Sequence, residues 1–157
     1  MIRFLKSLAV FKTSLKFFSI LSKYDVLNPF TKFLTSYSAK LNIFINKAQK
    51  VKSVEELAKN WQKLMPADAR ELFQIKSIDG NTAITEIHLH CPLRGTGLVN
   101  SCYKLMNYDR TLMKKVGGQL VVLESQANSG NNYCKIAIRP EGEDISDLKP
   151  AHLVNRN

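Results

Sequence analysis

Apolar residues change their spacing along this chain, and that change limits the fold to a combination of helices and strands. Up to about Met65 they recur every three or four residues, as they do along one face of a helix. From Phe73 onward they alternate with polar residues, as in a strand with one buried face. The first part of the chain is therefore expected to be helical and the second to contain a sheet.

Turn and cap signals divide the second part into two strand pairs around a helix. Asp79-Gly80-Asn81 predicts a hairpin turn, and Gly117-Gly118 predicts the C-terminal end of a helix. The expected elements are strands at Phe73–Ser77 and Thr82–His90, a helix at about Leu98–Val116, and strands at Gln119–Gln126 and Tyr133–Arg139. We therefore expect an α+β fold in which N-terminal amphipathic helices precede a ββαββ antiparallel-sheet domain.

A helix that directly precedes the sheet is indicated by signals at both of its ends. Ser53 and Glu56 have the spacing of a capping box. In this motif the serine hydroxyl accepts a hydrogen bond from the glutamate's backbone amide, and the glutamate side chain accepts one from the serine's backbone amide. Pro66 stops the helix after about Met65. Trp61 lies on its apolar face and is expected to anchor the helix where it meets the sheet.

Positive charge is concentrated near the N-terminus. Residues 1–53 hold ten basic residues and one acid, Asp25, so they carry +9 of the chain's net charge of +10. This division predicts a basic amphipathic helical region at 1–52, an α+β domain at 53–140 and an acidic, flexible tail at 141–157.

The basic region has the pattern of two amphipathic helices. Apolar residues form one stripe of the first helix, at Phe4, Leu8, Phe11, Leu15, Phe18 and Leu21. Lysines fall on its opposite side, at Lys6, Lys12, Lys16 and Lys23. Asn28-Pro29 is expected to end this helix, because a residue before proline disfavours helical backbone angles. A second apolar, basic segment spans 31–48 and carries Phe33, Leu34, Leu41, Phe44 and Ile45.

Two interpretations of these helices stay open. Their apolar stripes either pack on the rest of the protein or adsorb to an anionic membrane surface, with the lysines at the headgroups. Nucleic acid is the least favoured partner, because the basic residues of this region are nearly all lysine and no recognition motif accompanies them.

Composition excludes several classes of protein. Apolar residues make up 45% of the 157 residues, too many for a disordered chain. The sequence has no run of roughly 20 uncharged apolar residues, as a membrane-spanning helix requires. Three cysteines are too few and too scattered for a disulfide framework, which favours a reducing compartment. We expect a cytoplasmic location, on the inner face of the membrane if the helices adsorb there.

Residues able to support chemistry are concentrated between Glu86 and Asp109. His88 and His90 lie two apart on an expected strand, so their side chains point the same way. Cys91 begins a glycine-containing loop before a helix, so it is either a reactive thiol, with its pKa lowered by the N-terminal amides of that helix, or an unreactive one. Arg94 in this loop is either a solvated charge or a fork that binds a carboxylate.

The next helix places further candidates on one stripe, at Cys102, Met106, Asp109 and Met113. If the stripe faces the sheet, Asp109 becomes a buried carboxyl group that needs a hydrogen bond or serves as an acid or base. Cys102 is either a small buried apolar residue or a nucleophile. Cys134 alternates with Ile136 and Ile138 and is expected to be part of the core.

The segment from Cys91 through Cys102 and Asp109 to Cys134 resembles the C-terminal half of the L-2-amino-thiazoline-4-carboxylate hydrolase-like family. The shared pattern is a strand ending in cysteine, a helix with Cys and Asp on one face, and a strand pair with a late cysteine, over about residues 82–139. Met106 stands where family members often carry a second helix cysteine. The resemblance implies a small hydrolase that opens a sulfur- and nitrogen-containing ring carboxylate.

In the enzyme that this resemblance implies, Cys91 or Cys102 acts as nucleophile or metal ligand and Asp109 as general base or orienting group. His90 is then a proton shuttle, and Arg94 holds the substrate carboxylate.

Two alternatives stay open beside the hydrolase. One is a non-catalytic module that binds an apolar or lipid-like ligand at an anionic membrane surface. The other is a divalent metal held by His88, His90, Cys91 and either Cys102 or Asp109, although the chain lacks the paired cysteines typical of zinc sites.

Overall fold

Four antiparallel strands form one sheet in the computed structural model, which describes residues 7–154. The strands are β1 (Phe73–Asp79), β2 (Thr82–Ile87), β3 (Gly118–Glu124) and β4 (Cys134–Pro140). Their spatial order is β1-β2-β4-β3, so β4 lies between β2 and β3 and pairs with both. Ile136 and Ile138 of β4 are fully buried as a result. The expected α+β class and antiparallel sheet are confirmed.

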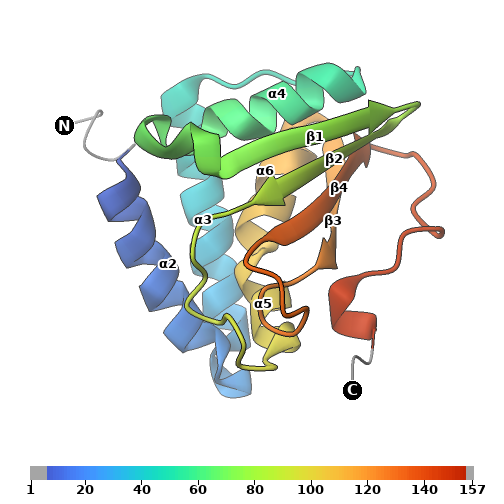
Figure 1. Ribbon diagram of the computed structural model, residues 1–157. Coiled ribbons are helices and arrows are strands. Elements are labelled where there is room, and N and C mark those ends of the chain that lie inside the picture. Colours follow the sequence, from blue (N-terminus) through green and yellow to red (C-terminus); the bar gives the residue numbers. More distant parts are fainter. Residues whose placement is uncertain (1–6, 155–157) are drawn as a thin grey trace.

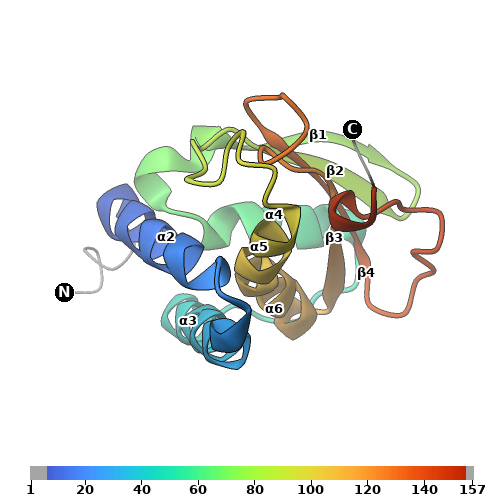
Figure 2. The same ribbon diagram turned by 90° about the horizontal axis from the view of Figure 1, so that it is seen from below.

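The helices form two layers on one side of this sheet (Figure 1). They are α2 (Leu8–Ser22), α3 (Asn28–Asn46), α4 (Val54–Leu64), α5 (Val99–Leu105) and α6 (Asn107–Val116), with short 3-10 turns at Asp25–Leu27, Ala67–Leu72 and Ala151–Leu153. Helix α4 packs on β1, β2 and β4, and α6 packs on β3. Helices α2 and α3 lie beyond α5 and α6, on the side away from the sheet (Figure 2).

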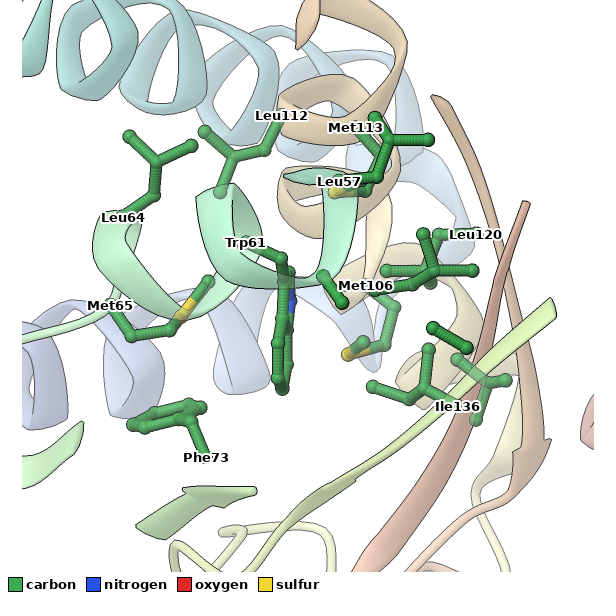
Figure 3. Packing of buried hydrophobic residues seen from close by; sticks show 14 of the residues in the cluster. Leu57, Trp61, Leu64, Met65, Phe73, Met106, Leu112, Met113, Leu120 and Ile136 are labelled. Carbon is green, nitrogen blue, oxygen red and sulfur yellow. The ribbon is translucent and has the colours of Figure 1, made fainter. Parts of the chain in front are cut away.

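Helix α4 joins the sheet to the other helices, as its sequence signals predict. The Ser53 hydroxyl accepts a hydrogen bond from the Glu56 amide at 3.2 Å and caps the helix. Trp61 is completely buried and meets Phe73 of β1 edge-on, with ring centres 5.9 Å apart. Figure 3 shows the indole pointing from α4 into the core, between Phe73 and Met106. The predicted role of Trp61 as an anchor against the sheet is confirmed.

Several element boundaries differ from the prediction. Strand β2 ends at Ile87, and not at His90, because the paired segments of both neighbouring strands stop there: Phe73 begins β1 and Cys134 begins β4 opposite Ile87. Pro29 lies in the first turn of α3 instead of ending the preceding helix, since proline there loses no intrahelical hydrogen bond. The expected helix over Leu98–Val116 is divided into α5 and α6 at Met106.

Helix α3 packs on α6 through small and hydroxyl-bearing residues. Thr31, Thr35 and Ala39 are fully buried, and both threonine hydroxyls donate to carbonyl groups of the preceding turn. Short side chains allow the two helix backbones to approach closely. The larger apolar residues Phe33 and Phe44 are consequently left on the outside, 62% and 79% exposed.

The acidic segment after β4 is exposed along most of its length but contacts the rest of the protein at several points. Arg139 forms an ion pair with Asp147 at 2.6 Å, and Gln119 donates to the Glu143 carbonyl at 2.6 Å. The His152 ring lies 3.9 Å from that of Tyr103 on α5. None of the helices in residues 7–154 combines the length and apolar character needed to cross a bilayer.

Candidate functional site

A cavity of about 250 Å³ lies between parts of α2 and α3 and the inner layer of the molecule. Its walls come from α2, α3, the C-terminal end of α4, strands β1 and β2, and helices α5 and α6. Apolar side chains dominate the lining, including Phe11, Leu15, Phe18, Ile45, Phe73 and Leu105. The apolar stripe predicted for the first helix therefore faces inward over Leu8–Phe18, while Phe4 and Lys6 lie outside the described residues.

Three of the five predicted site residues line the same cavity: Cys91, Cys102 and Asp109. Cys102 and Asp109, which the helical spacing placed on one stripe, are both buried, with 4% and 7% of their surface exposed. Cys134 and Gln126 line this part of the cavity as well. His90 is exposed and lies outside the lining, because the chain has already left strand β2 when it reaches this residue.

The three cysteines are free thiols in apolar surroundings. Burial raises the pKa of Cys91, partly offset by the Leu93 amide and the Arg94 charge. This shift is opposite to the predicted one, because α5 begins only at Val99 and presents no helix N-terminus to the thiol. Burial raises the pKa of Cys102 to about 11 and also raises that of Cys134. All three groups are therefore neutral thiols at pH 7.

Asp109 is a buried carboxyl group with one hydrogen bond to a side chain. The Trp61 indole N–H donates to its Oδ1 at 3.1 Å. Burial raises the pKa of Asp109 to about 6, against the opposing effects of the Trp61 bond and the Arg110 charge. A carboxyl group that titrates near neutrality beside a cavity is a feature of binding and catalytic sites. The sequence predicted that a buried Asp109 would have either a hydrogen-bond partner or an acid–base role, but it did not identify Trp61 as the partner.

Gln126 holds the loop that contains Cys91 and Arg94, and sequence reasoning missed it. Its Oε1 accepts from the Cys91 amide at 3.2 Å and from Arg94 Nε at 2.7 Å. Its Nε2 donates to the Leu89 carbonyl at 2.9 Å. Arg94 also donates to the Asn132 carbonyl at 2.9 Å, so two of its donors bind the protein itself. The one signal in the sequence that could have pointed to Gln126 is that it is a polar residue at the end of the β-rich run that begins at Gln119.

The histidine–carboxylate cluster lies apart from the cavity. His88 Nε2 is 2.8 Å from Glu86 Oε2, and the His88 ring lies 5.4 Å from that of Tyr133. Lys76 also pairs with Glu86, at 3.6 Å. Over residues 7–154, the His, Cys, Asp and Glu side chains do not form a group of three or more arranged to hold a metal ion.

The outer surface of α2 and α3 is apolar and basic, and we call it the α2–α3 face. Its large exposed apolar residues are Phe17, Ile20, Tyr24, Val26, Phe30, Phe33, Tyr37, Leu41 and Phe44. Its exposed lysines are Lys12, Lys16, Lys23, Lys32, Lys40 and Lys47. Leu41 belongs both to this face and to the lining of the cavity.

Comparison with protein-family models, curated proteins and solved structures finds no match to this chain.

Proposed function

We propose that the protein binds an apolar ligand in the cavity between α2–α3 and the inner layer of the molecule. The observation that carries this proposal is the lining, in which apolar side chains predominate and a smaller number of polar groups are present. Ligand sites in proteins typically combine apolar walls with a few polar groups that orient the ligand. The volume is close to the lower limit of such sites, about 300–1000 Å³, and suits a single chain of moderate length.

We further propose that binding takes place at an anionic membrane surface, with the α2–α3 face against the headgroups. The face combines aromatic and aliphatic residues with lysines, the composition of helices that lie in a membrane interface. Asp25, the single acid of residues 1–53, is paired with Lys104 and so opposes this attraction little. Anionic lipids mark the cytoplasmic leaflet, which agrees with the reducing compartment favoured by the scattered cysteines.

Trp61 provides the test of ligand binding, because it is the single tryptophan of the chain and bonds to Asp109 in the cavity wall. Titration with decanol should change its fluorescence in a saturable way. Ser14→Leu places a larger side chain in the cavity and should weaken binding by about tenfold or more, the effect of losing roughly 1.4 kcal/mol.

Thr13→Leu is the matched control, since Thr13 neighbours Ser14 on α2 but is exposed and outside the lining. This variant should bind decanol as the unchanged protein does. Equal affinity in the Ser14 and Thr13 variants, or a fluorescence response that never saturates, would contradict binding in the cavity.

A second candidate is hydrolysis of a small sulfur- and nitrogen-containing ring carboxylate, supported by the common cavity of Cys91, Cys102 and Asp109. The neutral state of the thiols makes it the weaker proposal, because the thiolate is the nucleophile. An aminothiazoline carboxylate is the substrate to assay. Turnover that Cys91→Ser abolishes without loss of stability would support it; absence of turnover in a protein that binds decanol would count against it.

A further inference from the structure

Two cations lie where the apolar cavity meets a second hollow near the end of α4. Lys63 and Arg70 line both spaces, together with Asn46 and Leu64. The remaining lining of the hollow is largely polar and includes Lys47, Gln49 and Asn60. A ligand in the cavity can therefore have its chain among apolar residues and its end beside two positive charges.

These cations are not neutralised within the protein. In the part of the chain from residue 7 to residue 154, neither Lys63 nor Arg70 forms an ion pair with a carboxylate. Arg70 donates from Nη2 to the Lys63 carbonyl at 3.1 Å, which fixes one side of the guanidinium group. The nearby acid Asp68 accepts instead from the Leu8 amide, at 2.8 Å. A guanidinium group with free donors matches the geometry of a carboxylate or a phosphate.

The carbonyl groups at this edge are occupied by side-chain donors. Helices α3 and α4 both end here, and unpaired carbonyl groups at a helix C-terminus would repel an anion. The Leu64 carbonyl accepts from Asn42 Nδ2 at 2.9 Å, and the Asn42 carbonyl accepts from Asn46 Nδ2 at 2.9 Å. The Lys63 carbonyl accepts from Arg70 in the same way, so three carbonyl groups at this edge are occupied by side-chain donors.

From this geometry we infer the class of the ligand: a single-chain amphiphile with an anionic head, a carboxylate or a phosphate, held by Lys63 and Arg70. Its chain extends along the cavity toward Cys91 and Cys134. The inference rests on the proposed binding of an apolar ligand and adds the headgroup chemistry. The cavity volume limits the ligand to one chain.

The test compares ligands of equal chain length with different heads, again through Trp61 fluorescence. Decanoate and decyl phosphate carry the anionic head, decanol lacks it, and inorganic phosphate lacks the chain. The double variant Lys63→Met with Arg70→Gln should weaken decanoate and decyl phosphate binding by about tenfold at low ionic strength, through the loss of charge-assisted hydrogen bonds. Decanol binding should be unchanged, because the substitutions leave the apolar lining in place.

Lys59→Met is the matched control, since Lys59 lies one turn earlier on α4, is exposed and lines neither space. It should leave decanoate binding unchanged, and Arg70→Lys should keep much of the affinity because it keeps the charge. Equal loss of decanol and decanoate affinity in the double variant, or no loss of either, overturns the headgroup site but leaves the apolar cavity standing.

Two further outcomes separate the sources of the signal. If inorganic phosphate competes with decanoate as strongly as decyl phosphate does, the site binds free anions, and the inference of an amphiphilic ligand is overturned. Failure of decanol and decanoate alike to bind would overturn the proposed function together with this inference.

Discussion

The carboxyl group of Asp109 is more costly to ionise in the folded protein than in the unfolded chain. Burial raises its pKa to about 6 from an ordinary value of 3.8, so the folded state holds a proton that the unfolded state has released over this interval. The stability that this proton provides is complete below about pH 4 and is lost as the pH rises through 6. The loss amounts to roughly 3 kcal/mol at most.

Asp109→Asn should remove this loss, because the amide cannot ionise and its oxygen can still accept from Trp61. At pH 8 we expect the variant to be about 1–2 kcal/mol more stable than the unchanged protein, with a flatter profile between pH 4 and 7. Denaturant unfolding at several pH values measures both. Asp109→Leu, which leaves the indole N–H unpaired, should be destabilised at every pH. A profile unchanged by Asp109→Asn would show that this carboxyl group does not titrate in the range.

Sequence reasoning located part of the site at the level of single residues. The helical spacing of Cys102 and Asp109 was enough to predict that both lie on one stripe of the helix, and the structure buries that stripe and places both residues in one cavity lining with Cys91. Gln126 and the exposed position of His90 could not be predicted in this way. Each depends on contacts between distant segments, the loop bonds of Gln126 and the limits of the strand ladder that ends β2.

Helix α3 shows what periodicity can and cannot predict for a whole element. Its existence follows from the sequence, but its buried side does not, because hydroxyl-bearing and small residues recur with the same helical spacing as the aromatic ones. Thr31, Thr35 and Ala39 form the buried side, and Phe33 and Phe44 lie outside. An exposed aromatic stripe between lysines is the basis for the proposed contact with a membrane.

Vesicle sedimentation tests the α2–α3 face. The protein should bind vesicles of phosphatidylserine and phosphatidylcholine and should bind phosphatidylcholine alone much more weakly. Lys32→Gln and Lys40→Gln should each reduce binding by about fivefold, given roughly 1 kcal/mol per lysine at an anionic surface. Phe33→Ser combined with Phe44→Ser should reduce it further without lowering stability, since both rings are exposed. Lys149→Gln, in the exposed acidic segment, is the control. Equal binding to both kinds of vesicle would contradict the electrostatic part of the proposal.

Over the whole molecule, the charge division of the sequence does not correspond to two separately packed units. Helix α3 packs along α6, α2 packs along α5, and Ala39 belongs to the same core as Trp61 and Ile136. From residue 7 onward, the lysines of the first region are exposed to solvent. The composition of this segment therefore differs from that of the rest of the chain, although the segment packs against it. The order of the strands in the sheet could not be predicted from the sequence either, because local patterns do not specify which strands become neighbours.

Removal of residues 1–52 should therefore abolish cooperative folding of the remainder. The deletion exposes the outer sides of α5 and α6 and opens one wall of the cavity. The loss should be comparable with the total stability of a domain this size, about 5–15 kcal/mol. Near-ultraviolet circular dichroism and binding of an apolar dye measure the outcome. A shortened chain that unfolds in one sharp transition would show that the basic region is an independent attachment.

Leu41 lies both on the outer face and in the cavity wall, and this position bears on how fast a ligand could move between a bilayer and the cavity. An acyl chain that desorbs from a bilayer into water exposes each methylene at a cost of about 0.8 kcal/mol, and this barrier makes spontaneous exchange slow. If the α2–α3 face lies on a bilayer as proposed, Leu41 would offer an acyl chain an apolar contact between bilayer and cavity, and so a route that bypasses that step. Transfer would then proceed during collisions, and its rate would rise with vesicle concentration instead of being set by escape into solution.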